Sequence, residues 1–284
     1  MDKLKDLLPL INDEFSKNEI PHIQRPMLAM SEVSKRLKMS FLFDSKEATY
    51  IQDWYSVRSK PESMKAGPIY QAAFYFDSEF WPVKIPIIFG SVSVDAFDAI
   101  SEMPNAIKHQ IQNNNQNILQ YSLFWADCFD FSYGFFDVEN NKDLNQKGLQ
   151  FLKAAFEELK SATALLLEPR INKRAILNLR MALEMLLKSY LAIKKGLSEK
   201  EAKSIGHDLK KALIEFSKSS KIDLPDEKIE LLNLFPKIAK RYEEQDISPK
   251  NISTCYNFSL FIGATICRDL SGRNMRNHVL GNNL

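Results

Sequence analysis

The sequence predicts an α+β protein, with a mixed domain over residues 1–140 and an all-α, up-and-down helical bundle over residues 147–284. Three observations lead to this prediction. The first part contains a stretch rich in β-branched and aromatic residues between proline and glycine breaks, which is typical of short strands. The second part repeats apolar residues every three or four positions, which is typical of packed helices. Residues 137–148, DVENNKDLNQKG, have the composition of a linker.

The mixed domain contains one predicted strand region and one segment that stays open. Residues 69–94, with breaks at Pro82, Pro86 and Gly90, predict two or three short strands. Residues 105–137 are ambiguous, because their Asn/Gln run at 112–117 fits a helix face or a loop. The aromatic residues of this segment predict either core or a patch that packs on the second half, and they are Phe124, Trp125, Phe129, Phe131, Phe135 and Phe136.

The bundle begins with two clearly periodic segments. The first is predicted over 149–166 and ends before Pro169. The second is predicted over 172–195, with Gly196 as its stop. A third helix is predicted to start at the capping box formed by Ser198 and Glu201 and to run through Phe216.

The remaining bundle segments are marked by prolines and a glycine. Pro225 opens a helical segment that Pro236 breaks or kinks. Ser248 and Pro249 are an N-cap and a first helical residue, and they predict a last long helix to about Leu270. Gly272 ends that helix, and a new segment begins at Arg273.

Composition excludes several classes of protein. The N-terminal apolar run is too short and too acidic at its flanks for a secretory signal, and no apolar stretch is long enough to span a membrane. The three cysteines are scattered and lack CxxC spacing, so we expect buried thiols, no zinc site and a cytoplasmic protein. None of the nine glycines lies in a GxGxxG or P-loop pattern, so we expect no ATP hydrolysis. We also expect no cofactor.

Charge is distributed unevenly along the chain. Residues 147–284 hold 24 Lys and Arg against 16 Asp and Glu, a net charge of +8, whereas residues 1–146 hold 14 against 20, a net charge of −6. A basic half suits a polyanion such as RNA. Lysine-rich helices that merely keep a solvated face would give the same balance, so charge alone leaves both readings open.

Two helical phrases and one terminal motif resemble the HEPN superfamily of small helical-bundle domains. The phrases are NLRMALEMLLKSYLAIKKGL at 178–197 and GHDLKKAL at 206–213. The motif is RNMRNH at 273–278, in which Arg273, Asn274 and His278 match the arginine, the polar residue and the histidine of the family pattern. The resemblance covers about residues 147–280. It implies a metal-independent endoribonuclease toxin, with antiviral (abortive infection) defence as one setting.

The chemistry of RNA cleavage suits these residue types. A histidine titrates close to neutral pH and can remove or supply a proton, and an arginine presents a permanently charged fork to a phosphate. On an ideal helix Arg273 and His278 lie about 140° apart, so we expect a homodimer to combine them in one composite cleft. Asn274 is expected to fix the imidazole or touch phosphate, and Arg276 to bind the RNA backbone.

Four further polar residues are candidates for a supporting role. Arg180 and Glu184 lie four apart on a predicted helix, as an intrahelical pair or as support for the cleft. His207 and Asp208 resemble part of a metal site, but only three other histidines remain as ligands, so we expect no metal and a structural role instead. The expected partners are RNA, a second copy of the chain, and an antitoxin or phage-derived trigger, without a membrane.

A non-catalytic function remains as the alternative. In that reading the chain is a HEPN-like dimeric module that binds RNA, a nucleotide or a protein without cutting. The aromatic-rich first half motivates it. If the chain is instead a nuclease, we expect residues 1–140 to be a sensor or regulatory (inhibitory) domain.

Overall fold

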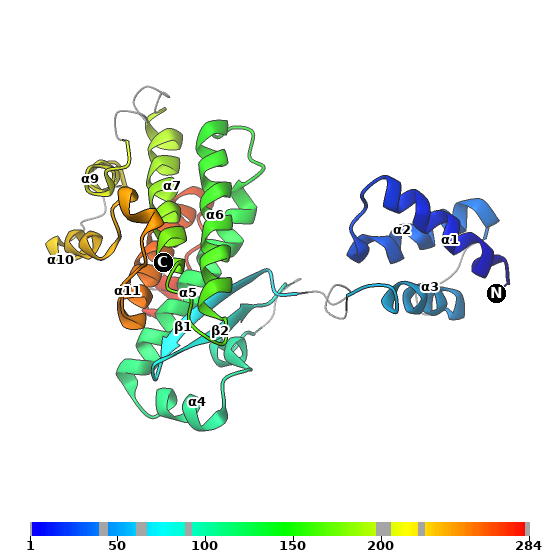
Figure 1. Ribbon diagram of the computed structural model, residues 1–284, viewed down its shortest axis with the longest axis horizontal. Helices are drawn as coiled ribbons and strands as arrows, with labels where there is room; N and C mark the ends of the chain where they lie inside the picture. The colour runs from blue at the N-terminus through cyan, green and yellow to red at the C-terminus, as the bar shows by residue number, and fades with distance from the viewer. Residues whose placement is uncertain are drawn as a thin grey trace. The chain divides into compact units, whose positions relative to one another are not determined.

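The computed structural model describes residues 2–39, 45–60, 67–88, 93–196, 206–220 and 225–281. It is mostly helical with one small sheet, in agreement with the predicted α+β class (Figure 1). The chain divides into two compact units, Met1–Gly67 and Pro68–Leu284. Each unit has a hydrophobic core of its own. The predicted capping box of Ser198 and Glu201, and the predicted break at Gly90, lie outside the described residues.

The described residues of the first unit form three α-helices around a small core. They are α1 (Asp2–Lys17), α2 (Arg25–Leu37) and α3 (Lys46–Ser56), with the 3-10 turn η1 (His22–Gln24) before α2. Leu8, Ile11 and Ile51 are fully buried between them. The Ser45 hydroxyl caps α3 by accepting a hydrogen bond from the Ala48 amide.

The strand region forms one antiparallel hairpin of β1 (Tyr70–Phe76) and β2 (Glu79–Ile85). Asp77 and Ser78 connect the strands with positive φ angles of 51° and 67°, as a tight two-residue hairpin turn requires. Pro82 lies inside β2, opposite Ala73, so it does not break the strand as predicted. The Ala73 amide donates a hydrogen bond of 3.3 Å to the Tyr256 hydroxyl, which ties the hairpin to the bundle. Two of the predicted strands are thereby confirmed.

The ambiguous segment is helical. It forms α4 (Asn105–Gln112) and the long α5 (Asn115–Val138), after the 3-10 turn η2 (Ala96–Ile100). The side chain of Asn114 caps α5 by accepting hydrogen bonds from two amides of its first turn. Most of the aromatic cluster is core, since Phe124, Trp125, Phe131 and Phe135 are buried. The Asn/Gln run at 112–117 spans the end of α4, the break between the two helices and the first turn of α5.

The predicted long helices of the bundle are confirmed. They are α6 (Gln146–Leu166), α7 (Ala175–Lys195), α9 (Leu209–Ser220) and α11 (Pro249–Ser271). The short α10 (Asp226–Glu230), η3 (Leu231–Leu234) and η4 (Ile238–Tyr242) lie between α9 and α11. Gly196 and Gly272 end α7 and α11 with positive φ angles of 64° and 76°, where a side chain would be strained.

The two compact units and the two predicted domains are divided at different places. The predicted boundary between residues 140 and 147 falls at the loop of residues 139–145 between α5 and α6, inside the second unit. α5 packs along α11 and α6 along α7, so helices on both sides of the loop share one core. Glycines allow this close approach, because a Cβ on Gly134 would lie 2.8 Å from the Cβ of Cys267. The hairpin packs against the same helices.

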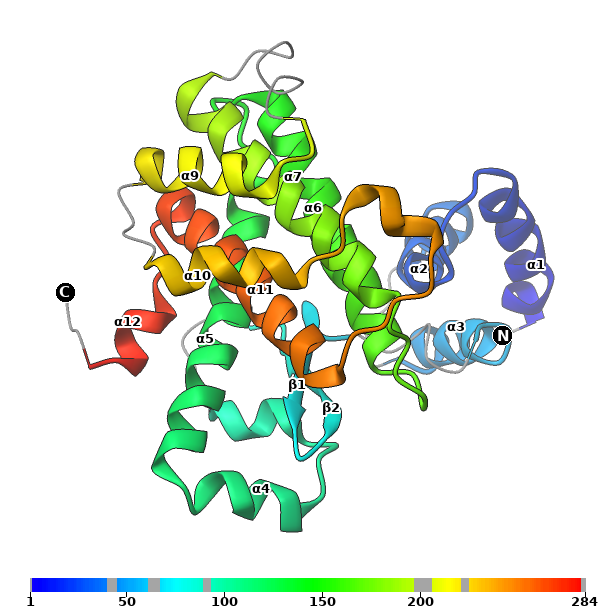
Figure 2. The same cartoon turned by 60° about the vertical axis from the view of Figure 1, so that its left-hand side comes forward.

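A final short helix, α12 (Met275–Val279), lies against α5 (Figure 2). It begins two residues after Arg273, the position at which we predicted a new segment. Over the described ranges, the structure has no helix with the length and apolar character that a bilayer span requires.

Candidate functional site at the start of α12

α5 presents a stripe of polar side chains to the segment that connects α11 with α12. Asp127, Asp130, Tyr133 and Asp137 follow one another at steps of three or four residues, so they share one face of the helix. The rest of α5 is strongly apolar and aromatic. Carboxylates in such a helix require positive or hydrogen-bonding partners, and the connecting segment supplies them.

Asp130 fixes the start of α12. Its side chain is fully buried, and it accepts hydrogen bonds from the backbone amides of Met275 at 2.6 Å and Arg276 at 3.2 Å. These are amides of the first helical turn, which have no partner within the helix. One carboxylate oxygen also lies 2.9 Å from the Arg268 guanidinium. The negative charge thus lies at the positive end of α12 and beside a cation from α11.

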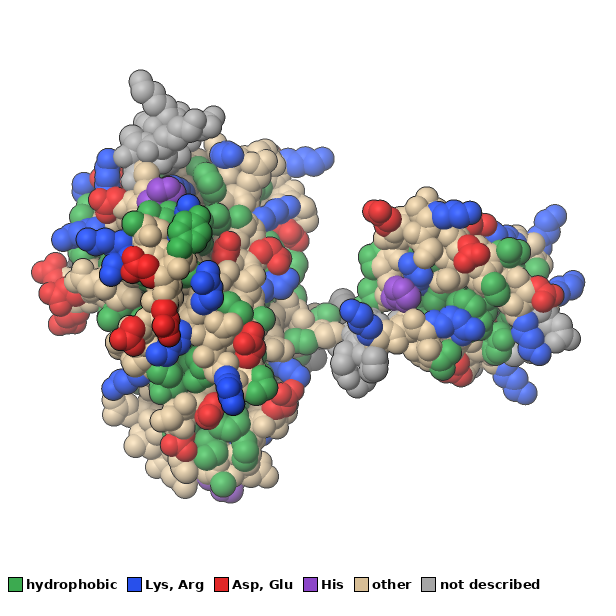
Figure 3. Space-filling model, viewed as in Figure 1, with side chains coloured by type: hydrophobic (Ala, Val, Ile, Leu, Met, Phe, Trp, Pro, Cys, Tyr) green, Lys and Arg blue, Asp and Glu red, His purple; other side chains and the backbone are tan. Residues whose placement is uncertain are grey.

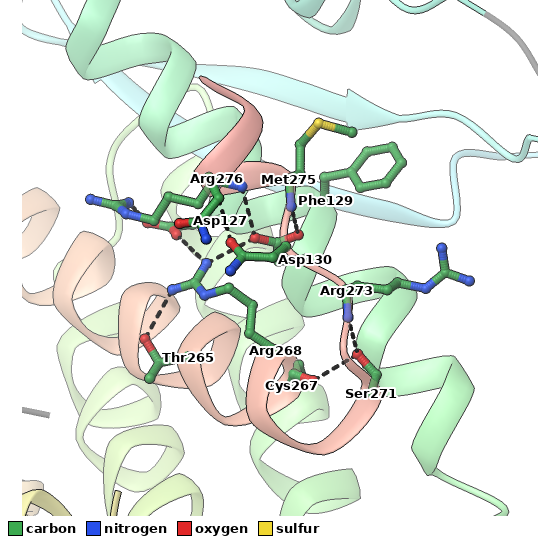
Figure 4. Close-up of polar contacts among 12 residues, drawn as sticks. Asp127, Phe129, Asp130, Thr265, Cys267, Arg268, Ser271, Arg273, Met275 and Arg276 are labelled. Carbon is green, nitrogen blue, oxygen red and sulfur yellow. Dashed lines mark hydrogen bonds and ion pairs between the residues drawn. The ribbon is translucent and has the colours of Figure 1, made fainter. Parts of the chain in front are cut away.

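Asp127 is shared between two arginines. Its two oxygens lie 2.9 Å from Arg268 and 2.7 Å from Arg276 (Figure 4). Burial raises the pKa of this carboxylic acid, and the two guanidinium groups act against that shift. Arg268 also donates to the Thr265 hydroxyl at 2.9 Å, so its fork is fixed from three sides. Arg276, which we predicted to bind RNA, is therefore held in an intramolecular ion pair.

Arg273 points away from this group of charges and toward the end of α5 (Figure 4). Two nitrogens of its guanidinium donate hydrogen bonds to the Asp137 carboxylate. Nη2 lies 3.1 Å from Oδ1, and Nε makes a closer bond to Oδ2. The hydrogen bond to Asp137 raises the arginine pKa, so the group stays charged. The central carbon (Cζ) of the guanidinium lies 5.4 Å from the centre of the Tyr133 ring, within the range of a cation–π contact. The side chain is nevertheless 44% exposed.

Asn274 and His278 lie at the two ends of α12. The Asn274 side chain caps the helix by accepting a hydrogen bond of 3.1 Å from the Asn277 amide, so its oxygen does not fix the imidazole. His278 is exposed, and its ring has no hydrogen bond or ion pair with any described residue. Arg273 precedes the helix, so the 140° separation expected for an ideal helix does not apply to it.

The four supporting candidates lie in a separate cluster. Arg180 and Glu184 form the predicted intrahelical pair at 3.1 Å, with exposures of 7% and 6%. Arg180 also donates to the backbone carbonyls of His207 and Pro236, each at 2.8 Å. Glu184 further accepts from Lys188 at 2.8 Å and lies 2.9 Å from His207 Nδ1. The cluster joins α7 to the segments before α9 and η4, and no bond connects it with the described residues of α12.

Asp208 completes this region as a helix cap. Its carboxylate accepts a hydrogen bond of 3.0 Å from the Lys211 amide at the start of α9. Within the ranges that the structure describes, no three His, Cys, Asp or Glu side chains are grouped closely enough to hold a metal ion. His207 contacts Glu184 and Asp208 caps α9, which fits the structural role expected for both residues.

Sequence reasoning missed the acidic side of the site. Asp127, Asp130 and Asp137 were not among the candidates, and neither was Arg268. Their signal is present in DCFDFSYGFFD, where carboxylates recur on one face of an otherwise apolar helix. What that signal could not identify was the partner, which lies well over a hundred residues further along the chain.

Comparisons of this chain with models of known protein families, with curated proteins and with solved structures found no match.

Proposed function

We propose that the chain is a metal-independent endoribonuclease of the HEPN type, in which Arg273 and His278 act on the RNA backbone. One observation carries the proposal. The RNMRNH motif is anchored through Asp130, while its arginine and histidine side chains remain open to solvent. A frayed polar tail would have no buried anchor of this kind.

The proposed reaction needs no metal. The 2′-oxygen of the RNA attacks the adjacent phosphorus while a base removes its proton, and the bond to the 5′-oxygen breaks as that oxygen receives a proton. His278 is suited to the proton transfers and Arg273 to the negative charge of the phosphorane. The products are a 2′,3′-cyclic phosphate and a 5′-hydroxyl end.

A second copy of the chain is part of the proposal. Arg273 and His278 have no contact within one copy, since the arginine is directed at Asp137 and the histidine lies at the far end of α12. A two-fold dimer would allow the arginine of one copy and the histidine of the other to meet at one phosphate. The setting we propose is antiviral defence, with an antitoxin or phage-derived trigger as regulator.

Cleavage in the presence of EDTA tests this function. The purified wild type is incubated with transfer and messenger RNA beside His278→Ala and His109→Ala, the latter being an exposed histidine on α4 as matched control. We expect the wild type and His109→Ala to cleave, and His278→Ala to lose at least about 100-fold in rate, as is usual for loss of a general acid or base. Equal rates for His278→Ala and the wild type, or no cleavage by any, refute the proposal.

A non-catalytic binding module is the second candidate, and a specific observation favours it. Arg268, Arg273 and Arg276 are each matched by a carboxylate of α5, so the motif presents little uncompensated positive charge. On the face shown in Figure 3, basic and acidic side chains are likewise interspersed over the larger unit.

Expression in a bacterial host separates the candidates. Growth arrest that Arg273→Ala abolishes supports the nuclease, and unimpaired growth with RNA binding retained in His278→Ala supports the module.

A further inference from the structure

A cavity lies beside the buried Arg180, and none of its described lining residues belongs to α12. It has a volume of about 480 Å³, and residues of α6, α7, His207 and η4 line it. Small-molecule sites in proteins usually measure about 300–1,000 Å³. The cavity is therefore large enough for a compact organic ligand.

One part of the cavity lining is apolar. Leu165, Leu177, Met181 and Ile238 provide apolar surface from three different elements. All four are only partly buried, so their side chains are available to a ligand. An aliphatic or aromatic body placed there would remove apolar surface from water, which favours binding.

The arginines that line the cavity differ in whether a carboxylate neutralises them. Arg180 is neutralised by Glu184 and fixed by two carbonyls. Arg174 and Arg241 also line the cavity, and neither forms an ion pair with a carboxylate of the described chain. Among the described lining residues Glu158 alone is acidic, and it accepts a hydrogen bond of 2.7 Å from Asn178. The exposed guanidinium groups of Arg174 and Arg241 are therefore available to bind an anion.

We propose that this cavity binds a small organic anion, whose charged group contacts Arg174 and Arg241 and whose apolar body packs on Leu177, Met181 and Ile238. Guanidinium forks bind carboxylate and phosphate through paired hydrogen bonds, so either headgroup fits. Arg180, held on three sides, gives the floor of the site a fixed shape. The site is independent of the nuclease proposal, because it shares no residue with the RNMRNH motif.

A matched pair of dyes tests the proposal. Anilinonaphthalene sulfonate carries an anionic group on an apolar body, and N-phenylnaphthylamine has the same body without the charge. Fluorescence titration of the full chain is expected to show saturable binding of the anionic dye and at least about tenfold weaker binding of the neutral one, since bonds to charged groups contribute about that factor. Equal affinity for both dyes, or no saturable binding, overturns the proposal.

Two double variants locate the binding. Arg174→Gln with Arg241→Gln removes the proposed anion contacts from exposed positions, and thermal melting verifies that the fold is kept. Lys153→Gln with Lys160→Gln is the control at a second cavity of about 550 Å³, beside Phe135 and Phe156. We expect the arginine variant to lose at least about tenfold in affinity for the anionic dye and the lysine variant to bind as the wild type does. The reverse pattern, or equal losses, places the dye elsewhere and refutes the site.

Competition distinguishes the headgroups. Naphthoate and naphthyl phosphate share one apolar body and differ in their anion, and each is titrated against the bound dye. Displacement by either one supports an anion site and identifies the preferred headgroup. Failure of both to displace the dye contradicts the proposal.

Discussion

The carboxylate of Asp130 on α5 lies 2.6 Å from the backbone nitrogen of Met275, the first residue of α12. This contact joins a buried position in the middle of the chain to the RNMRNH motif near its carboxyl end. The same carboxylate faces Arg268, so charge pairing within the core and capping of α12 depend on one side chain. The position of Arg273 and His278 therefore follows from α5.

Asp130→Ala should destabilise the protein and release α12. Removing one partner of a buried ion pair usually costs about 3–5 kcal/mol, and two amides of α12 also lose their acceptor. Urea unfolding should show the loss, and hydrogen exchange of residues 273–281 should accelerate. The exposed Asp143→Ala serves as control, with an expected change below about 0.5 kcal/mol. Unchanged exchange in Asp130→Ala would show that α12 is held by other contacts.

Gly263→Ala should weaken the packing of α5 on α11. A Cβ at this position would lie 2.8 Å from the Phe131 ring, which is fully buried. Overpacking of this kind costs about 1–3 kcal/mol, and the better helix propensity of alanine returns up to about 1 kcal/mol. We expect a lower urea midpoint than in the wild type. Gly67→Ala, where no neighbouring atom from the described part of the chain lies within 4 Å of the new Cβ, should leave the midpoint unchanged.

Glu184 should contribute to acid sensitivity. Burial acts to raise the pKa of its carboxylic acid, but Lys188 and His207 together outweigh burial and lower it below 4.5. A carboxylate whose pKa is lower in the folded state stabilises the fold above its unfolded pKa, and this contribution is lost as pH falls through the folded pKa. As the pH falls from 7 to 3, the free energy of unfolding of Glu184→Gln should therefore decrease less than that of the wild type. Parallel stability curves from pH 7 to pH 3 would argue against this role.

The three cysteines should be unreactive in the native protein. Cys128, Cys255 and Cys267 are buried free thiols. Burial raises the pKa of Cys255 to about 12 and also raises the pKa of the other two thiols. Since the thiolate is the reactive form, a thiol reagent such as Ellman's should modify none of them before unfolding and all three in denaturant. Rapid modification of the folded protein would mean that the core opens locally.

The helices of the bundle were predictable because each has a single apolar face with clear stops. Gly196, Gly272 and the Ser248–Pro249 pair mark ends that local backbone physics determines. α5 was not predictable in the same way. It is apolar on most sides, so it lacks the periodic signal of a surface helix, and its membership of the bundle depends on long-range contacts with α11.

The candidate site was predictable only as a motif. Spacing identified Arg273 and His278, whereas the functions of Asn274 and Arg276 were set by partners that are distant in sequence. Asn274 caps α12 and Arg276 binds Asp127, and neither role can be read from the RNMRNH segment alone. The pairing of Arg180 with Glu184 was predictable because it depends on helix spacing within one segment.

Mixing two inactive variants tests the composite site most directly. In the proposed dimer, Arg273→Ala and His278→Ala each spoil both Arg–His pairs of the composite cleft, but a mixed dimer retains one pair with an intact arginine and an intact histidine. After unfolding and refolding the two together, we predict recovery of about a quarter of the wild-type rate of RNA cleavage in EDTA, from statistical assortment of two-fold dimers. A mixture as inactive as either variant alone, under conditions in which refolded wild type cleaves, would contradict a cleft shared between two copies.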